Sequence, residues 1–286
     1  MLRLLSLAIP LLVFIHGCET LPQTTSTFAS QWSDHPAIER PWAGGEYWLN
    51  PLQAWMQKHG KLQCEVSGGD RNAVLLTHTV SSMDNFTMKV NIENLQPENR
   101  SDTSGWVGFQ IGLKGAFNDY RDDAVHGRGL CLGLTNNGKL FIGDHHQSIQ
   151  LDSYGSISFQ LQLTGSVASD SNYHLSLQYL DSETHIADTF GLAVHHSWIQ
   201  GLVALACSQT MPTPVSYNEP RPHFRDIPEL GKQAGGNTRY AFSGWMLEGE
   251  AVAAHPERRY GPIMWTQYTL SDSLLKLSVQ LAPVGN

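Results

Sequence analysis

The sequence has little charge and no concentration of positive charge. Asp, Glu, Lys and Arg make up 15% of its 286 residues, and the formal net charge is −8. Lysine and arginine are scattered along the chain, so the basic patch that nucleic-acid binding requires is missing. Gly, Ser, Thr, Asn and Gln fill the gap, a composition typical of extracytoplasmic β proteins. The composition therefore argues against a nucleic-acid-binding protein.

Several motifs that would identify an enzyme are also missing. The sequence has no GxSxG, so a hydrolase with a nucleophile elbow is unsupported. The stretch SGGDRN (67–72) is not followed by GK[ST] and is not a phosphate loop. The pairs His145-His146 and His195-His196 are adjacent residues, which point to opposite faces of a strand. They predict surface or half-buried histidines rather than a metal site.

Cysteine is scarce, with four residues and no CxxC motif. Apart from Cys18, which belongs to the N-terminal signal described next, the chain holds Cys64, Cys131 and Cys207. This odd number argues against a disulfide framework, although one bridge stays open in an oxidising compartment. Cys131 and Cys207 lie in apolar runs, which predicts small buried side chains.

The N-terminus has the pattern of a lipoprotein signal peptide over residues 1–18. An apolar run at 4–15 follows Arg3 and is too short to span a bilayer as a mature helix. It ends in Ile-His-Gly-Cys, which resembles the bacterial lipobox except at His16. We therefore expect an acyl anchor at Cys18 and a place in the bacterial cell envelope, periplasmic or surface-exposed. An ordinary secretory signal is the alternative.

The rest of the chain divides into a tether and one domain. Residues 19–40 are polar and predict a flexible tether, and residues 41–286 predict a single domain. The segment 211–237 has no periodicity and predicts a long loop.

Alternation of apolar and polar residues dominates that domain. It is clearest in FTMKVNIE (86–93), ISFQLQL (157–163), YHLSLQYL (173–180) and the stretch 275–281. We count about ten to twelve such strands with few short helices and no crossover helix. The pattern predicts an all-β fold, a concanavalin A-like β-sandwich or jelly roll of two antiparallel sheets.

Two neighbouring strands have an unusually smooth face. In GWVGFQIGL (105–113) and GLCLGL (129–134), small residues alternate with the apolar residues expected to face the core. Glycine inside a strand often marks the close approach of a ligand or of another backbone. This face is therefore expected either to bind a flat ligand such as a sugar ring or to lie under a covering layer.

The stretch FNDYRDDAVHGRG (117–129) gathers charged residues between two apolar runs. Asp119, Asp122 and Asp123 are candidate ligands for Ca²⁺, although the spacing is not that of an EF-hand. In the alternative interpretation, Arg121 and Arg128 pair with these carboxylates and fix the loop between two strands.

No catalytic residue is predicted, and the candidate ligand contacts are aromatic, charged or amide side chains. Aromatic rings are the expected contacts for the apolar faces of sugars. The candidates are Trp106, Gln110, Tyr120, Arg121, Asp122, Arg128 and Trp245.

Three long stretches carry a resemblance to a known family: residues 48–80, 117–144 and 260–285. They resemble the N-terminal region of bacterial PhoD-like alkaline phosphatase/phosphodiesterase proteins, over roughly residues 40–286. In that family a concanavalin- or laminin-G-like sandwich precedes a metallophosphatase domain. The resemblance implies that residues 117–129 belong to the sandwich and not to a phosphatase centre.

The chain departs from this family in the metal-ligand blocks of the phosphatase. Gly143-Asp144 continues as His-His-Gln and Gly236-Asn237 as Thr-Arg, so neither GDxxD nor GNHD is completed. We expect a non-catalytic, membrane-anchored module that binds a glycan or a cell-surface polymer. One alternative is a protein related to the phosphodiesterases and alkaline phosphatases that lacks its catalytic domain or acts with a separate catalytic chain. A second is a Ca²⁺-dependent glycan hydrolase.

Overall fold

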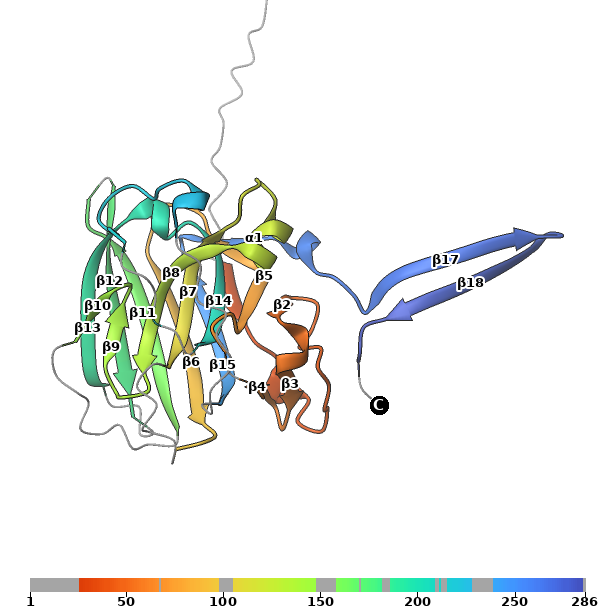
Figure 1. The fold of residues 1–286 in the computed structure, drawn as a ribbon, viewed down its shortest axis with the longest axis horizontal. Helices are drawn as coiled ribbons and strands as arrows, with labels where there is room; N and C mark the ends of the chain where they lie inside the picture. Colours follow the sequence, from red (N-terminus) through yellow and green to blue (C-terminus); the bar gives the residue numbers. More distant parts are fainter. Residues whose placement is uncertain are drawn as a thin grey trace, which may run out of the picture.

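The computed structural model describes residues 26–66, 68–97, 105–147, 158–169, 171–181, 186–208, 211, 215–227 and 239–284. The predicted signal peptide and Cys18 lie outside these residues, as does much of the predicted loop at 211–237. Two large antiparallel sheets pack face to face, and a two-stranded hairpin extends away from them (Figure 1). The predicted all-β sandwich is confirmed.

The first sheet, sheet A, has the order β13-β12-β11-β6-β15-β4-β3, with β1 also paired to β15. Its alternating sequences place every second side chain in the core, as in β6, where Phe86, Met88, Val90 and Ile92 are buried. The strands are β1 Ser26–Ala29, β3 Trp55–Lys58, β4 Lys61–Cys64, β6 Phe86–Asn94, β11 Ser158–Val167, β12 Asn172–Leu180, β13 Ile186–His195 and β15 Tyr240–Gly249.

The second sheet, sheet B, has the order β10-β9-β8-β7-β14-β5-β16, with β2 also paired to β5. Its strands are β2 Tyr47–Asn50, β5 Asn72–Val80, β7 Trp106–Lys114, β8 Arg128–Thr135, β9 Leu140–Ile142, β10 His145–His146, β14 Gly201–Ser208 and β16 Val252–Ala254. Strands β5, β7 and β8 are apolar along most of their length, because both faces of this sheet are covered.

The smooth outer face of sheet B is buried. Gln110 is 4% exposed, Cys131 2% and Trp106 0%. Trp106 and Cys131 form a small cluster with Phe141 and Ala206, against which Met211 packs. Of the two expectations for this face, the covering layer is the one observed.

A glycine near the end of β7, where the pairing with β8 is irregular, lies close to another backbone. A Cβ on Gly112 would lie 2.0 Å from the carbonyl oxygen of Trp198, and its φ of +63° also disfavours a side chain. Trp198 ends the short 3₁₀-helix η3, His196–Trp198. The small residue therefore permits close packing rather than access for a ligand.

Helical structure is sparse in the described part of the chain. It consists of the α-helix α1, Tyr120–His126, and of short 3₁₀-helices. Besides η3 these are η1 Trp32–Asp34, η2 Leu52–Ala54, η4 Phe224–Asp226 and η5 Pro256–Arg258. No helix among the described residues is long and apolar enough to cross a membrane.

Two predicted boundaries are wrong. Residues 26–40 do not belong to a flexible tether, because β1 pairs with β15 and Trp32 is 2% exposed in the core. At the other end, the strands β17, Ile263–Ser271, and β18, Leu274–Leu281, pair with each other and not with the sandwich. The alternation at 275–281 identified a strand correctly, but period alone does not say what the strand packs against.

Candidate functional site

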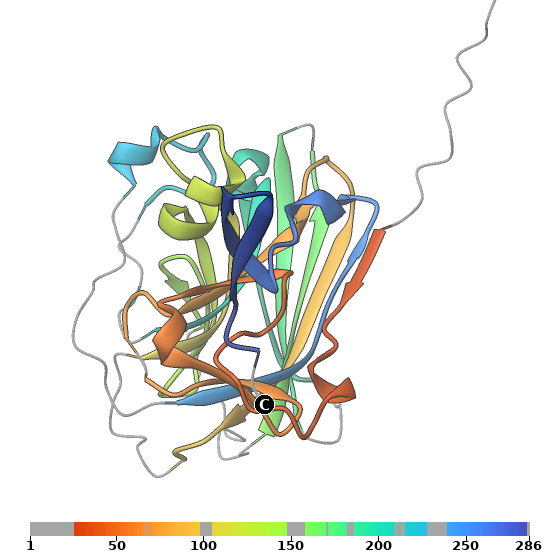
Figure 2. The same cartoon turned by 90° about the vertical axis from the view of Figure 1, so that its right-hand side faces the viewer.

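The stretch 117–129 forms a turn and the helix α1, which cover the outer face of sheet B where β7 ends (Figures 1 and 2). The sequence predicts only a loop here. Asp119 begins the helix, because its Oδ1 accepts a hydrogen bond from the backbone N–H of Arg121 at 2.9 Å. Ala124 on the inner side of the helix is buried against β5, β7 and β14, next to Tyr120.

Each of the three aspartates of this stretch accepts a hydrogen bond from a backbone N–H group nearby. Asp122 Oδ2 accepts a hydrogen bond from the N–H of Phe117 at 2.9 Å. Asp123 Oδ1 accepts one from the N–H of Gly115 at 2.7 Å. Asp119 pairs with the guanidinium of Arg121, with Oδ2 2.6 Å from Nη2. Each carboxylate therefore has its own partner.

The predicted calcium site at Asp119, Asp122 and Asp123 is not assembled. Across the described residues, no group of three or more His, Cys, Asp or Glu side chains is placed to hold a metal ion. A hard cation such as Ca²⁺ needs several oxygen ligands around one point, and these three carboxylates are directed to different backbone groups. The other expectation, a loop fixed by charged side chains, describes the geometry, with Arg121 as the observed partner.

An open cleft of about 610 Å³ lies beside α1. Its walls come from the end of β5, the end of β7, residues 118–123, the start of β14 and the η5 segment. These segments lie far apart in the sequence and meet because β5, β14 and β7 are neighbours in sheet B. The cleft is the candidate functional site.

The cleft gathers positive charge on a chain that is negative as a whole. Lys114, Arg121 and Arg258 line it against two carboxylates, Asp119 and Asp123. The whole chain carries a formal net charge of −8. The local excess of cations is therefore a property of this cleft and not of the surface in general.

Arg258 is held over an aromatic ring. Its guanidinium lies 5.0 Å from the centroid of the Tyr120 ring, and its Nε forms an ion pair with Oε1 of Glu257 at 3.7 Å. The cation–π contact orients the guanidinium, and solvent screens its ion pair with Glu257, whose side chain is 67% exposed. Arg121 lies 6.0 Å from the same ring.

The surroundings in the cleft also shift the pKa values of the titratable side chains that line it. Burial lowers the pKa of Lys114, and the neighbouring guanidinium of Arg221 lowers it further, against the opposite effect of Asp123. Burial raises the pKa of Asp123, which the Gly115 hydrogen bond partly offsets. The hydrogen bonds from Arg121 lower the pKa of Asp119 to about 2. Burial and the charge of Arg258 lower the pKa of His255.

Neutral polar groups complete the lining. Thr79, Ser81, Asn118 and Gln200 contribute hydroxyl and amide groups. The hydroxyl of Thr79 lies 3.1 Å from Nε2 of His255. Hydroxyl and amide side chains both donate and accept hydrogen bonds, which suits a ligand rich in hydroxyl groups.

The cleft brings together only some of the predicted contact residues. Tyr120 and Arg121 line it, whereas Asp122 supports the turn at Phe117 and Arg128 lies elsewhere. Arg128 Nη1 donates to the carbonyls of Phe224 and Ile227, and its guanidinium lies 4.3 Å from the centroid of the Phe224 ring.

The prediction of a ligand contact is wrong for three residues in this fold. Trp106 and Trp245 are completely buried, and Gln110 is 4% exposed. Trp245 packs in the core between the sheets, 5.4 Å from the ring of Phe28, and Trp106 packs 5.3 Å from Phe141. Their rings therefore do not offer a platform to a sugar.

Sequence reasoning missed Lys114, His255, Arg258 and the nearby Arg221. The guanidinium of Arg221 donates to the carbonyls of Gly112, Lys114 and Arg128 and thereby ties residues 215–227 to the ends of β7 and β8. These residues carry no local motif. They converge through strand pairing over long sequence separations, which no spacing in the sequence reports.

No family model and no curated protein matches the sequence. Among solved structures the chain is similar to the binding domain of botulinum neurotoxin serotype D/C VPI 5993, with 12% identity, a TM-score of 0.35 and coverage of 79% of this chain and 44% of that one. It is also similar to a Bauhinia forficata lectin in complex with GalNAc, with 11% identity, a TM-score of 0.42 and coverage of 81% and 99%. An endo-1,3-β-glucanase from Streptomyces sioyaensis gives 8% identity, a TM-score of 0.39 and coverage of 68% and 79%. No function follows from likenesses this weak.

Proposed function

We propose that the chain is a non-catalytic binding module whose cleft beside α1 recognises an acidic glycan of the cell surface. The observation that carries this proposal is the gathering of Lys114, Arg121 and Arg258 in one open cleft of a chain with net charge −8. An anion in the cleft would also relieve the repulsion between Lys114 and Arg221. The hydroxyl and amide groups around the cations suit sugar hydroxyls.

We further propose that an acyl chain on Cys18 anchors the module, as the apolar run and the lipobox-like ending suggest. β1 begins at Ser26, eight residues after Cys18, so the sandwich would start at most about 28 Å from the anchor. Ser26 pairs with Gly249, and Ser81 of the cleft donates its backbone N–H to Ala251. The cleft and the anchored end of β1 thus lie at the same end of the sandwich, a position that suits a polymer close to the membrane.

A second candidate function, glycan hydrolysis, has one observation in its favour. Asp119 and Asp123 both line the cleft and their pKa values shift in opposite directions, as for a base and an acid. Binding without turnover is favoured because both oxygens of Asp119 are bonded to Arg121 and Asp123 holds the turn at Gly115. A carboxylate that maintains the backbone is poorly placed to react.

The test measures binding of the full chain to three polymers: polygalacturonate, dextran sulfate and uncharged dextran. We expect saturable binding to an acidic polymer and none to dextran. Arg258→Ala should weaken that binding about tenfold, the effect of removing one charge-assisted contact. Arg225→Ala is the matched control, because Arg225 is an exposed arginine outside the cleft.

Two results would count against the proposal. Equal binding by the Arg258→Ala and Arg225→Ala variants would mean that the cleft does not hold the ligand. Release of reducing sugar from the polymer that Asp123→Asn abolishes would show that the chain is a hydrolase and not a non-catalytic binding module.

A further inference from the structure

The hairpin β17–β18 has an apolar face that nothing in the described chain covers. Its two strands make a ladder only with each other, and it projects away from the sandwich (Figures 1 and 2). Its base is tied to the sandwich by the hydrogen bond from Tyr260 N to Gly45 O at 3.1 Å. A lone two-stranded hairpin is marginally stable in water, so a sequence that keeps one needs a cover for it.

The register puts most of the apolar residues on one side. Cross-strand partners share a face, and Tyr268 pairs with Leu277, Leu270 with Leu275 and Ile263 with Leu281. The opposite face is mostly polar and pairs Gln267 with Ser278 and Thr269 with Lys276. It also carries two exposed apolar residues, Trp265 opposite Gln280 and Leu274 opposite Ser271. Seven large side chains on the apolar face are 43–71% exposed: Ile263, Tyr268, Leu270, Leu275, Leu277, Val279 and Leu281.

The size of this face matches one half of a dimer interface. At roughly 100 Å² of exposed surface for each of the seven side chains, one copy offers about 700 Å² and two copies about 1,400 Å², within the about 1,200–2,000 Å² that specific interfaces bury. A face of this size also exceeds the largest apolar patch of a typical monomer, which is about 300–600 Å².

The charge of the hairpin favours a copy of itself over a charged partner. Between Ile263 and Leu281 the charged residues are Asp272 in the turn and Lys276 on the polar face. The apolar face thus presents no charge that would select an acidic or basic partner. An uncharged, flat apolar face is complementary to itself across a twofold axis, the commonest symmetry of oligomers.

We propose that the chain forms a homodimer in which the apolar faces of two β17–β18 hairpins pack against each other. Each hairpin covers the other, so the sandwiches stand apart and both clefts stay open. This inference does not depend on what the cleft binds.

The test measures the mass of the full chain in solution by sedimentation, on a Cys18→Ser background so that no acyl chain adds self-association. We expect a twofold fall in mass on dilution or on Leu277→Asp, which charges the apolar face. Ser278→Asp is the matched control, since it adds the same charge on the opposite face. The sandwich should unfold alike in both variants, because the hairpin lies outside its sheets.

Three results would overturn the dimer. A monomer at every concentration would show that the apolar face does not bind a second copy of the chain. A dimer that survives Leu277→Asp would place the interface elsewhere. A monomer that floats with phosphatidylcholine vesicles would make a lipid surface the occupant of the hairpin.

A second, independent observation concerns two buried thiols. Cys64 lies on β4 of sheet A and Cys207 on β14 of sheet B, in the core between the sheets. They are 0% and 1% exposed, and the two thiols hydrogen-bond to each other. Cys131 belongs to the separate cluster on the outer face of sheet B.

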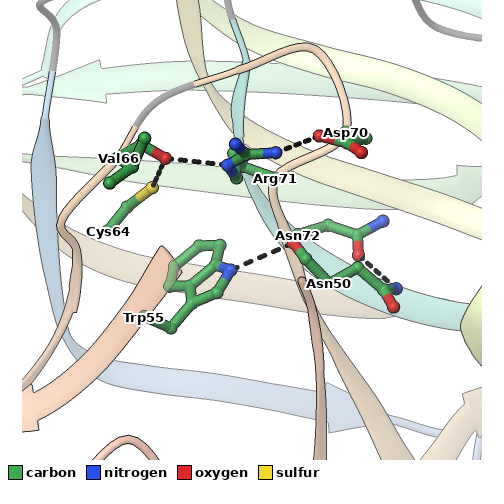
Figure 3. A network of polar contacts seen from close by, with 7 residues as sticks. All are labelled: Asn50, Trp55, Cys64, Val66, Asp70, Arg71 and Asn72. Carbon is green, nitrogen blue, oxygen red and sulfur yellow. Dashed lines mark hydrogen bonds and ion pairs between the residues drawn. The ribbon is translucent and has the colours of Figure 1, made fainter. Parts of the chain in front are cut away.

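We propose that Cys64 and Cys207 are joined by a disulfide when the chain folds in the presence of a disulfide oxidant. Each thiol loses one proton, a sulfur–sulfur bond forms, and two electrons pass to the oxidant, whose own disulfide opens to two thiols. Cys64 then ceases to donate to the carbonyl of Val66, 3.3 Å away. That carbonyl keeps a donor, because Nε of Arg71 lies 2.8 Å from it (Figure 3).

The test refolds the full Cys18→Ser chain with oxidised and reduced glutathione, alkylates it in denaturant and maps the peptides by mass. We expect a linked Cys64–Cys207 peptide pair and an alkylated Cys131, and the same link in a Cys131→Ser variant. Alkylation at all three positions, in a chain whose circular dichroism shows the native fold, would overturn the bond. So would a linked peptide that contains Cys131.

Discussion

At the scale of single residues, the end of α1 depends on a glycine that leaves no room for a side chain. Gly127 ends the helix, and a Cβ there would lie 2.0 Å from the carbonyl oxygen of Asp123, a backbone atom that cannot turn away. The same stretch supplies Tyr120 and Arg121 to the cleft. The shape of one wall therefore rests in part on Gly127, which does not itself line the cleft.

Gly127→Ala should lower the free energy of unfolding by about 1–3 kcal/mol, the usual cost of overpacking a filled position. Chemical denaturation measures it. Gly191→Ala is the control, since a Cβ there meets only the side chain of His174, at 3.1 Å, and the carbonyl of Leu175, at 3.4 Å. Equal stability of the two variants would mean that the turn adjusts to the added methyl group.

The ion pair of Asp119 with Arg121 makes the stability of the start of α1 depend on pH. Arg121 lowers the pKa of Asp119 from 3.8 to about 2. A carboxyl whose pKa is lowered by folding contributes stability that is present above pH 3.8 and is lost as the pH falls through about 2. The amide signal of Arg121, which donates to Asp119, should therefore titrate near pH 2 in a nuclear magnetic resonance experiment.

The Asp119→Asn variant provides the comparison. Asparagine caps a helix as well as aspartate does, so α1 should persist while the titration disappears. A midpoint near 3.8 in the unmodified chain would show that the contact with Arg121 does not persist in solution.

At the scale of elements, the 215–227 segment is joined to sheet B by one arginine. Arg221 donates to three carbonyls at the ends of β7 and β8, and its guanidinium lies 5.4 Å from the centroid of the Trp198 ring. Burial lowers its pKa to about 10, which leaves it charged at neutral pH. The segment thus holds a cation beside Lys114 and the cleft.

Arg221→Met should lower the free energy of unfolding by about 2–4 kcal/mol, because it leaves buried carbonyls without donors. It should also raise the pKa of Lys114, since a neighbouring like charge is removed. Denaturation and the titration of isotope-labelled lysine measure the two effects. A stable variant with an unchanged lysine titration would contradict the described position of Arg221.

The elements also show how far the sequence alone could be interpreted. Alternation identified most strands of both sheets, because a half-buried strand leaves a period of two in its residues. Alternation placed residues 275–281 in the sandwich, whereas they form a strand of the separate hairpin. The same alternation suits a strand in a large sheet and a strand in a lone hairpin. The helix at 120–126 was missed because its seven residues are too short for a helical period.

The cleft was predicted only in part, for the same physical reason. Tyr120 and Arg121 were found because they lie in one conspicuous stretch of charged residues. Lys114, His255 and Arg258 reach the cleft from other segments through strand pairing. Trp106 and Trp245 were predicted as contacts from their chemistry, but burial depends on packing, which residue type does not give.

At the scale of the whole molecule, the sandwich, the N-terminal strand and the hairpin have separate roles. The sandwich carries the cleft at one end, β1 begins at the same end, and the hairpin extends away (Figure 1). A dimer through the hairpins would present two clefts. Binding to a long polymer would then gain from the presence of two linked sites.

The measurement that tests the central claim most directly is the affinity of the full chain for polygalacturonate over a range of salt concentrations. We expect the affinity to fall steeply as salt rises. Arg258→Ala should lower both the affinity and the salt dependence, whereas Arg225→Ala should change neither, because only contacts in the cleft involve the polymer. Binding that is independent of salt, or equal for the two variants, would contradict an anion-binding cleft beside α1.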